Sequence, residues 1–169
     1  ELSTALFMIT IASYYKPAKG IGVKKYVTGF LFSQDTNQIV LIKKINPQWQ
    51  RGLFNGIGGK VEANETSIDA MVRECAEETG VITQPVDWQY FANVFRPNGY
   101  DVDLYFARTD LALSAKTMEA EEIHIMKVSA IPKNIIPNLQ WLIPLALDNQ
   151  ADFSTPVFIK EIAQERLKA

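Results

Sequence analysis

A short run of acidic residues at helical spacing constrains this chain more than any other feature. In residues 73–80, the sequence RECAEETG places Glu74, Glu77 and Glu78 on one face of a helix predicted over residues 67–79. Three carboxylates within about one helical turn repel each other unless a cation neutralises them. Because Mg²⁺ takes oxygen ligands and works with phosphate-bearing substrates, this spacing points to a divalent metal and a phosphate substrate.

Both ends of this helix carry the expected stop and start signals. Thr66 is a favourable N-cap, and Asp69 three residues later completes a capping-box pattern. Gly80 follows the last helical residue, where a left-handed residue commonly ends a helix. The face beside the acidic one is apolar and is predicted to pack on a core; it comprises Ile68, Met71, Val72, Cys75, Ala76 and Thr79.

The remaining elements alternate strands with loops. β-branched and aromatic residues predict strands over residues 23–33, 38–45, 86–94, 101–107 and 124–128, with a Gly-rich strand-like segment at 54–61. Turn residues predict that the first two strands form a hairpin and that a turn at 96–99 joins the next pair. An apolar helix is predicted over residues 136–148. The tail allows a strand within 155–162 or a short helix within 160–169.

The bulk composition favours one globular domain over residues 1–169. Apolar residues make up 47% and charged residues 21% of the chain. We expect a core over about residues 20–150, an N-terminal arm at 1–19 and a C-terminal tail at 151–169. The apolar stretch at 2–15 is too short to span a bilayer, so no membrane association is expected.

Charge and cysteine content narrow the partners and the compartment. The formal net charge is −2, so no basic field favours duplex nucleic acid as a partner. The single cysteine, Cys75, excludes an internal disulfide framework and suits a reducing compartment. We therefore expect a cytoplasmic protein whose partner is a small molecule.

The residues at fixed offsets in 59–81 resemble the Nudix box, G-x5-E-x7-R-E-U-x-E-E-x-G-U, where U is a bulky aliphatic residue. Cys75 stands at the first U position, a departure expected to affect packing only. The resemblance covers about residues 20–150 and implies an α/β fold, a Nudix-type α/β/α sandwich with a mixed β-sheet. The matching residues are Gly59, Glu65, Arg73, Glu74, Glu77, Glu78, Gly80 and Val81.

This resemblance implies a hydrolase that cleaves a nucleoside diphosphate linked to another moiety, with Mg²⁺ or Mn²⁺ as cofactor. In the family pattern, Arg73 orients a catalytic glutamate, Glu65 holds the loop through a salt bridge, and Gly80 belongs to the structural part of the box. The metals neutralise the phosphate oxygens and polarise a phosphorus centre, while one carboxylate or a metal-bound hydroxide activates water. The implied metal ligands are the carbonyl of Gly59 and the carboxylates of Glu74, Glu77 and Glu78.

The general base is left open by the sequence. Glu77 is one candidate, and a glutamate outside the box, Glu121 or Glu122, is the other. Glu122 is also predicted as a further metal ligand. For both residues outside the box, a solvated loop charge is an equally good interpretation.

The residues before the box bear on the substrate. Phe54, Asn55 and Lys60 fall in the sequence FNGIGGKV, which resembles the W-N-G-F-G-G-K-V pattern of MutT-type members that act on oxidised purine nucleoside triphosphates. The resemblance implies that these three residues bind substrate and that Asn55 contacts the base, since an amide offers both a donor and an acceptor. The alternative for Asn55 is that it stabilises the Gly-rich turn. The favoured reaction converts a nucleoside triphosphate to a monophosphate and pyrophosphate.

Two alternatives remain. Pro97 lies about where pyrophosphatases of ADP-ribose and related dinucleotides carry a proline, which favours that substrate class as the first alternative. The second is a catalytically inactive nucleotide-binding module, although such modules typically lack box residues that are present here. Trp49 and Trp141 are further candidates for the base pocket. The two chain ends are candidates for a homodimer interface.

Overall fold

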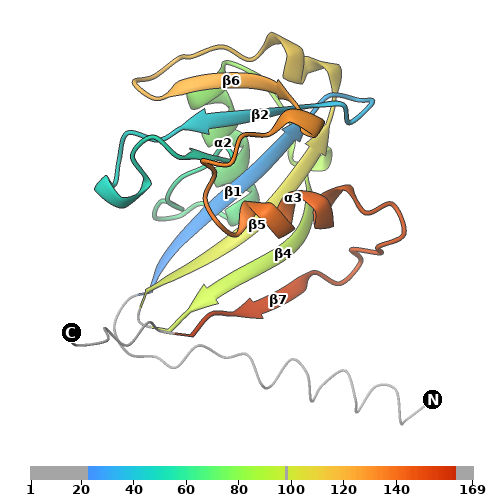
Figure 1. The fold of residues 1–169 in the computed structure, drawn as a ribbon. Coiled ribbons are helices and arrows are strands. Elements are labelled where there is room, and N and C mark those ends of the chain that lie inside the picture. The colour runs from blue at the N-terminus through green and yellow to red at the C-terminus, as the bar shows by residue number, and fades with distance from the viewer. Residues whose placement is uncertain (1–22, 98, 163–169) are drawn as a thin grey trace.

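The computed structural model describes residues 23–97 and 99–162, so the expected N-terminal arm at 1–19 lies outside the described residues. Its centre is a seven-stranded sheet with the order β3-β2-β1-β5-β4-β7, and β6 pairs with the other side of β2 (Figure 1). The strands are β1 (Lys24–Phe32), β2 (Gln38–Lys43), β3 (Phe54–Asn55), β4 (Gln89–Arg96), β5 (Tyr100–Arg108), β6 (Glu122–Lys127) and β7 (Val157–Lys160). The helices are α2 (Ser67–Thr79) and α3 (Leu139–Leu147).

The sheet is mixed, as predicted. β1 pairs with β5 in parallel, β4 pairs with β7 in parallel, and the other neighbours are antiparallel. Both predicted hairpins are confirmed, since β1 pairs with β2 and β4 with β5. The parallel β1–β5 pair forms the middle of the sheet and connects these two hairpins into one surface.

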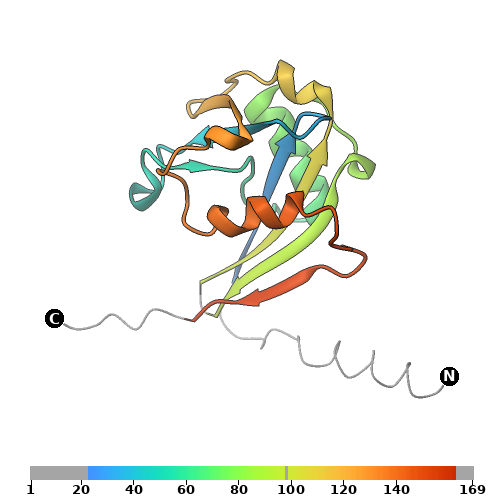
Figure 2. The same ribbon diagram turned by 45° about the vertical axis from the view of Figure 1, so that its right-hand side comes forward.

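One helix covers each face of the sheet, which confirms the predicted three-layer α/β/α arrangement (Figure 2). On one face, Met71 and Cys75 of α2 pack against Val27 and Leu31 of β1. On the other face, the apolar side of α3 packs against phenylalanines and aliphatic residues of β1, β2, β4 and β5. Burying apolar area on both faces supplies the main driving force for this fold.

Gly29 leaves room for the Met71 side chain of α2 against β1. A Cβ atom at this position would lie 2.6 Å from the sulfur of Met71 and 2.7 Å from the ring of Trp88. Real Cβ atoms essentially never come this close to carbon or sulfur, so with a side chain at this position Met71 and Trp88 would have to shift. The packing of the Met71 side chain of α2 against β1 therefore depends on this glycine.

Several element boundaries differ from the sequence prediction. In the segment predicted as strand-like at 54–61, only Phe54–Asn55 forms a strand, because Gly58 adopts φ +147° and interrupts regular pairing. The strand predicted from residue 86 begins at Gln89, because Pro85–Asp87 forms a 3₁₀ turn. The backbone N–H groups of Asp87 and Trp88 donate to carbonyls within this turn, so they do not pair with a neighbouring strand.

The second helix begins later than residue 136 for a similar reason. Phe54 donates its N–H to the carbonyl of Asn134 at 2.8 Å, and Ile136 donates to the carbonyl of Phe54 at 2.9 Å. These bonds hold residues 134–136 beside β3 and prevent them from joining α3. The strand prediction for the tail is confirmed by β7, whereas the helix alternative extends into residues 163–169, outside the described part.

Within the described part of the chain, no helix has the length and apolar character needed to cross a membrane.

The core contribution of β2 can be tested with Leu41, which is fully buried. Leu41→Ala should lower the free energy of unfolding by about 2–5 kcal/mol, because it removes buried methyl groups and leaves a cavity. Chemical denaturation followed by circular dichroism measures this. The matched control is Leu113→Ala, at a residue that is 49% exposed, where the loss should stay below about 1 kcal/mol. Equal losses at the two positions would contradict the core assignment.

Candidate functional site

The acidic helix begins and ends as its sequence predicts. The side chain of Thr66 accepts a hydrogen bond from the backbone N–H of Asp69, and the Asp69 carboxylate accepts one from the backbone N–H of Thr66. Gly80 at the other end has φ +72° and donates its N–H to the carbonyl of Ala76. With both ends fixed, the register of the charged residues along α2 is fixed as well.

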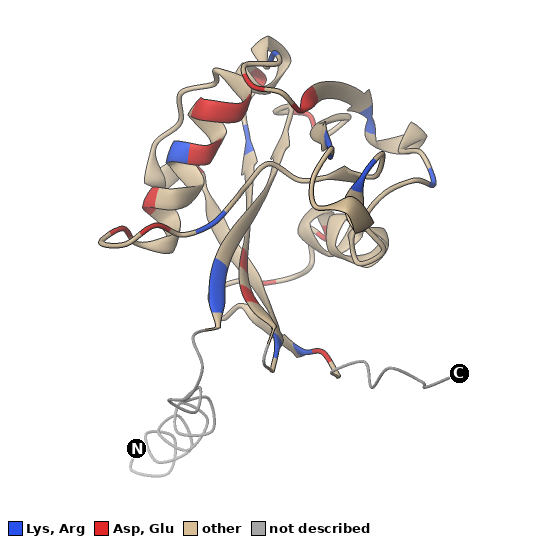
Figure 3. Cartoon of the chain, turned by 90° about the vertical axis from the view of Figure 1, so that its left-hand side faces the viewer, with Lys and Arg blue, Asp and Glu red and all other residues tan. Residues whose placement is uncertain are grey.

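Arg73 is the main cation of this helix. Its guanidinium donates to both carboxylate oxygens of Glu65, at 3.1 Å from Nε and 2.7 Å from Nη2. It also donates from Nη1 to Glu74 at 2.9 Å and to Glu77 at 2.8 Å, and from Nη2 to the carbonyl of Lys60 at 3.1 Å. One basic residue thus lies among the acidic residues of α2 (Figure 3) and connects the helix with the loop that precedes it.

The pKa shifts of Glu65 and Arg73 agree with these hydrogen bonds. Hydrogen bonds from Arg73 lower the pKa of Glu65 below its ordinary value, and a backbone N–H contributes to the same shift. The bond to Glu65 is likewise the largest cause that raises the pKa of Arg73. The contact expected from the sequence, a salt bridge from Glu65 that holds the loop, is present.

The three carboxylates on the acidic face differ in burial. The side chain of Glu77 is 50% exposed and that of Glu74 is 14% exposed, whereas Glu78 is buried. Burial raises the pKa of Glu74, and it raises the pKa of Glu78 to about 8 although a backbone N–H and Lys44 act in the opposite direction. Two partly desolvated carboxylates that repel each other are a place where a cation would bind favourably.

Two glycines bring the backbone against these carboxylates. Gly58 donates its N–H to Glu78 at 2.9 Å. A Cβ atom at Gly59 would lie 2.4 Å from a carboxylate oxygen of Glu74, so the absence of a side chain leaves the space in which carbonyl and carboxylate oxygens can converge. Oxygen donors without sulfur or imidazole suit a hard cation such as Mg²⁺ or Mn²⁺, and the residues present therefore fit the expected cofactor.

The predicted metal ligands do not form a ready-made cage. Among residues 23–97 and 99–162, no three Asp, Glu, His or Cys side chains are arranged to hold a metal ion. The reason is visible in the contacts: Arg73 holds Glu74 and Glu77, while Glu78 is held by the backbone of Gly58. The role of these residues in metal binding stays a prediction.

The two glutamates outside the box lie in different surroundings. Glu121 pairs with Lys44, accepts backbone N–H bonds from Ile45 and Asn46, and is one of the charges that raise the pKa of Glu78. Burial raises the pKa of Glu121, but these hydrogen bonds outweigh burial and keep its pKa below the ordinary value.

The side chain of Glu122, in contrast, is 64% exposed, and its ion-pair partners are Lys43 and His124. Of the two, Glu121 is therefore the one coupled to the acidic face of α2.

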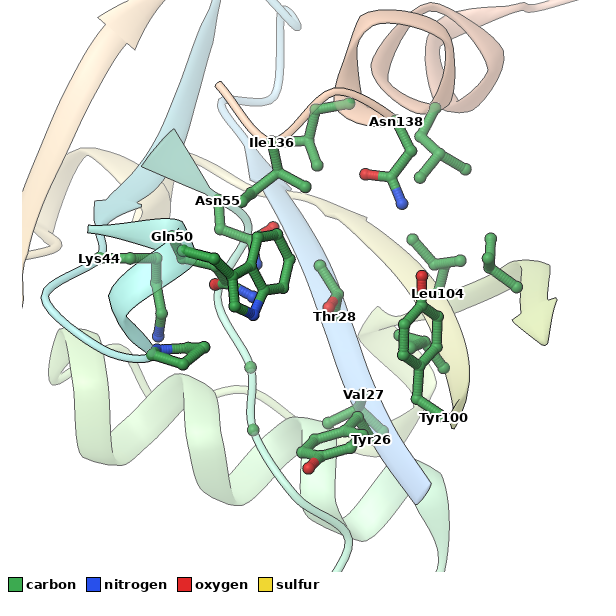
Figure 4. A pocket seen from close by; sticks show the side chains of 18 of the residues that line it. Tyr26, Val27, Thr28, Lys44, Gln50, Asn55, Tyr100, Leu104, Ile136 and Asn138 are labelled. Atoms are coloured by element: carbon green, nitrogen blue, oxygen red, sulfur yellow. The ribbon is translucent and has the colours of Figure 1, made fainter. Parts of the chain in front are cut away.

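A cavity of about 410 Å³ adjoins the Gly58–Gly59 backbone. Its walls come from β1, β4, β5, the loop after β2 and the start of α3, and Figure 4 shows Thr28, Asn55, Tyr100 and Asn138 around the same space. The lining residues are Tyr26, Val27, Thr28, Lys44, Asn46, Pro47, Trp49, Gln50, Asn55, Gly58, Gly59, Val94, Gly99, Tyr100, Val102, Leu104, Ile136, Asn138, Leu139 and Leu142. This mixture of apolar walls and a few amides is typical of a small-molecule site.

The predicted substrate residues divide into two groups. Asn55 and Trp49 line the cavity. Phe54 does not: it is buried and packs edge-on against His124 with ring centres 5.0 Å apart. Lys60 and Trp141 are also outside the lining; the backbone of Lys60 instead binds Arg73.

Sequence reasoning missed Asn138 and Tyr100. Asn138 occupies the N-cap position of α3, yet its side chain makes no capping hydrogen bond. Its Oδ1 is buried and has no hydrogen-bond partner within the described residues, which is rare for a buried amide. In the sequence this residue is indistinguishable from an ordinary cap, since asparagine is favoured there. Tyr100 follows a turn, and nothing local indicates that its ring faces a cavity.

Comparison with known proteins agrees with this geometry. A model of the NUDIX domain matches residues 24–144. By sequence, no curated protein matches the chain. The chain belongs to the NUDIX domain family. As a member with every fixed charged and glycine position of the box in place, it is a pyrophosphohydrolase.

Several solved structures share the fold. One is MutT, from work on Aliivibrio salmonicida and Vibrio cholerae, with 22% identity over 73% of this chain and 95% of its own, and a TM-score of 0.56. A NUDIX hydrolase from Nitrosomonas europaea has 21% identity over 85% of this chain and 80% of its own, with a TM-score of 0.57. The NUDIX domain of Shewanella oneidensis NrtR, complexed with ADP ribose, has 16% identity over 85% of this chain and 98% of its own, with a TM-score of 0.60.

The central place of Arg73 leads to a prediction about stability. In metal-free buffer, Arg73→Ala should lower the free energy of unfolding by about 1–3 kcal/mol, because it leaves partly buried carboxylates without a cation. Urea unfolding in the presence of a chelator measures the effect. Arg51→Ala is the control, since Arg51 is exposed and lies away from the acidic helix in the sequence. A variant as stable as the control would show that these ion pairs contribute nothing to folding.

Proposed function

We propose that this protein is a Mg²⁺-dependent enzyme that hydrolyses a purine nucleoside triphosphate, including oxidised forms, to a monophosphate and pyrophosphate. The observation that carries the proposal is the position of the cavity. Its rim at Gly58 and Gly59 is the backbone that contacts Glu74 and Glu78, and its interior holds the amides of Asn55 and Asn138. A nucleotide with its base in the cavity would bring its phosphates to the acidic helix.

In this proposal the acidic face of α2 holds the cofactor. Glu74, Glu77, Glu78 and the carbonyl of Gly59 would bind Mg²⁺ or Mn²⁺, which neutralises phosphate oxygens and polarises the phosphorus that is attacked. Arg73 would keep Glu74 and Glu77 in place from one side, as its hydrogen bonds to both carboxylates support.

The proton acceptor for the attacking water would be Glu77 or Glu121. Glu77 is the most exposed of the box carboxylates on α2, so it can reach water without rearrangement. Glu121 is coupled electrostatically to Glu78 and is held by Lys44, which itself lines the cavity. The location of Glu121 favours it over Glu122 as the residue outside the box that accepts the proton from the attacking water.

Asn55 and Asn138 would recognise the base. A carboxamide offers one acceptor and two donors, which is the chemistry needed to read the edge of a purine. Asn138 lines the cavity, and its side chain is not used to cap α3, which supports this role. Trp49 lies in the same lining with 64% of its surface exposed, so its ring is available for stacking.

ADP-ribose or a dinucleotide is the second candidate substrate. The cavity extends to Gly99 and Tyr100, beside the turn that carries Pro97, so the far end of a longer substrate could lie there. The NrtR domain with the same fold was solved with ADP ribose. The third candidate function is a nucleotide-binding module without activity. The presence of all the charged and glycine residues of the Nudix box argues against this candidate.

The experiment that decides among these is a substrate panel with Mg²⁺. It comprises normal and oxidised nucleoside triphosphates, ADP-ribose, NADH and a diadenosine polyphosphate, with products separated by chromatography. We expect preferential conversion of triphosphates to monophosphate and pyrophosphate. Release of phosphate alone from a triphosphate would contradict the proposal. Preference for ADP-ribose would select the second candidate, and tight binding without turnover the third.

Glu78→Gln should lower kcat about 100-fold or more while the protein remains folded, because it removes a negative charge from the expected metal site. Steady-state kinetics across a Mg²⁺ titration measures this, with Glu62→Gln as the control because Glu62 is exposed and precedes the helix. The same assay on Glu121→Gln and Glu122→Gln ranks these two residues. Activity of Glu78→Gln equal to that of the control would remove the catalytic assignment.

A further inference from the structure

The strand β7 lies beyond the part of the chain that matches the NUDIX domain, which ends at residue 144. It forms the edge of the sheet and pairs in parallel with β4 (Figure 2). Glu161 continues this ladder by one residue, since its N–H donates to the carbonyl of Phe95 at 2.8 Å. The backbone of Glu161 is therefore fixed beside the end of β4.

The side chain of Glu161 binds both ends of the β4–β5 turn. One carboxylate oxygen accepts hydrogen bonds from the hydroxyl of Tyr100 at 2.5 Å and from Arg96 Nε at 3.0 Å, and it lies 2.7 Å from Arg96 Nη2 in an ion pair. The guanidinium of Arg96 also lies over the ring of Tyr100, 4.9 Å from its centre. We call Glu161, Arg96 and Tyr100 the Glu161 clamp.

The clamp is partly shielded from water. The side chain of Glu161 is 23% exposed and that of Arg96 is 35% exposed. Hydrogen bonds to a charged group are stronger than neutral ones, and they are screened less where water is partly excluded. Two such hydrogen bonds and the ion pair on a single carboxylate therefore restrict the rotamers of Glu161 and Arg96.

Tyr100 connects the clamp to the cavity. Its ring lines the cavity, as Figure 4 shows, and its hydroxyl is bound to Glu161. Burial, and after it the hydrogen bond to Glu161, raise the pKa of Tyr100 to about 12, so the hydroxyl remains a neutral donor at physiological pH. The position of this wall of the cavity thus depends on a residue at the end of β7.

The backbone neighbours of the clamp line the cavity as well. Gly99 precedes Tyr100, and Val94 of β4 is paired with Ile159 of β7. Ile159 in turn packs against the core on the α3 side of the sheet. β7 therefore supports the cavity through a strand pairing, through apolar packing and through the clamp.

We propose that Glu161 is a positioning residue for substrate binding, which fixes the ring of Tyr100 against the bound nucleotide. The inference rests on the proposed nucleotide site but assigns a role to a segment outside the NUDIX match. None of the clamp contacts involves the carboxylates of α2, so Glu161 acts on affinity and leaves the chemical step unchanged.

The test compares Glu161→Ala with Lys160→Ala, an exposed neighbour on the same strand. The probe is the α,β-imido analogue of GTP with Mg²⁺, measured by titration calorimetry beside ADP-ribose, and KM and kcat are measured on the best substrate of the panel. Glu161→Ala should raise Kd and KM about tenfold, the usual scale for losing a charged hydrogen bond, with kcat within about twofold. Lys160→Ala should match the wild type.

Glu161→Gln and Tyr100→Phe keep the inference testable if Glu161→Ala does not fold. Glu161→Gln preserves the shape and an acceptor oxygen, and Tyr100→Phe preserves the ring and removes only the hydroxyl. Tyr100→Phe removes the hydrogen bond to Glu161, and Glu161→Gln weakens it by removing the charge. Each should raise Kd, and the Kd of the double variant should be close to that of Tyr100→Phe, because the hydroxyl that Glu161 holds is already absent there.

Unchanged Kd and KM in folded clamp variants would overturn the positioning role while leaving the proposed function standing. A lower melting temperature with unchanged Kd would also overturn it, since it would show a purely structural contact. If the wild type binds and hydrolyses no nucleotide, the proposed function fails and the positioning role fails with it.

Discussion

The hydrogen bonds of Arg73 are the interaction on which the arrangement of the site depends. A single guanidinium bridges the loop before α2, through Glu65 and the carbonyl of Lys60, and the helix itself, through Glu74 and Glu77. Without a cation in this place, the carboxylates of Glu74 and Glu77 would repel each other. The loop would also lose the hydrogen bonds that hold it against α2. Arginine suits the task because its planar group has five donors and can serve several acceptors at once.

Close backbone approach is the second constraint, and it links metal chemistry to nucleotide binding. Gly29 leaves room for the side chains of Met71 of α2 and Trp88 against β1, and the Gly58–Gly59 backbone lies between the helix and the cavity. One side of this backbone contacts Glu74 and Glu78, and the other side lines the cavity. The same two residues therefore border the place where phosphates would bind and the place where a base would bind.

The walls of the cavity come from segments that are far apart in the chain. Asn55 precedes the box, Tyr100 follows the β4–β5 turn, and Asn138 precedes α3. β7 adds support from outside the region that matches the NUDIX domain. The likeness to solved structures at 16–22% identity concerns the fold of the domain, and the cavity described above rests on the side chains of this chain alone.

The mixed three-layer fold was implied by the resemblance of residues 59–81 to the Nudix box. The sequence by itself determined α2, its caps, the box and both hairpins. These features follow from local spacing: hydrogen bonds of a cap or a turn join residues a few positions apart, and the apolar periodicity marks the buried face. Asn55, predicted from the resemblance, and Trp49, predicted as an aromatic residue in a loop, both line the cavity; their contact with a base stays a prediction. The sequence could not place Phe54, which points into the core beside His124.

Only the tertiary structure decided which charged and polar residues meet. The burial of Glu78 depends on the approach of Gly58, twenty residues earlier, and the choice between Glu121 and Glu122 depends on which one faces Lys44 after β6 pairs with β2. The sequence places Asn138 inside the helix predicted over residues 136–148, whereas in the structure it precedes α3 and lines the cavity. Desolvation and electrostatic coupling act through space between distant segments, and a pattern along the chain carries no information about such distances.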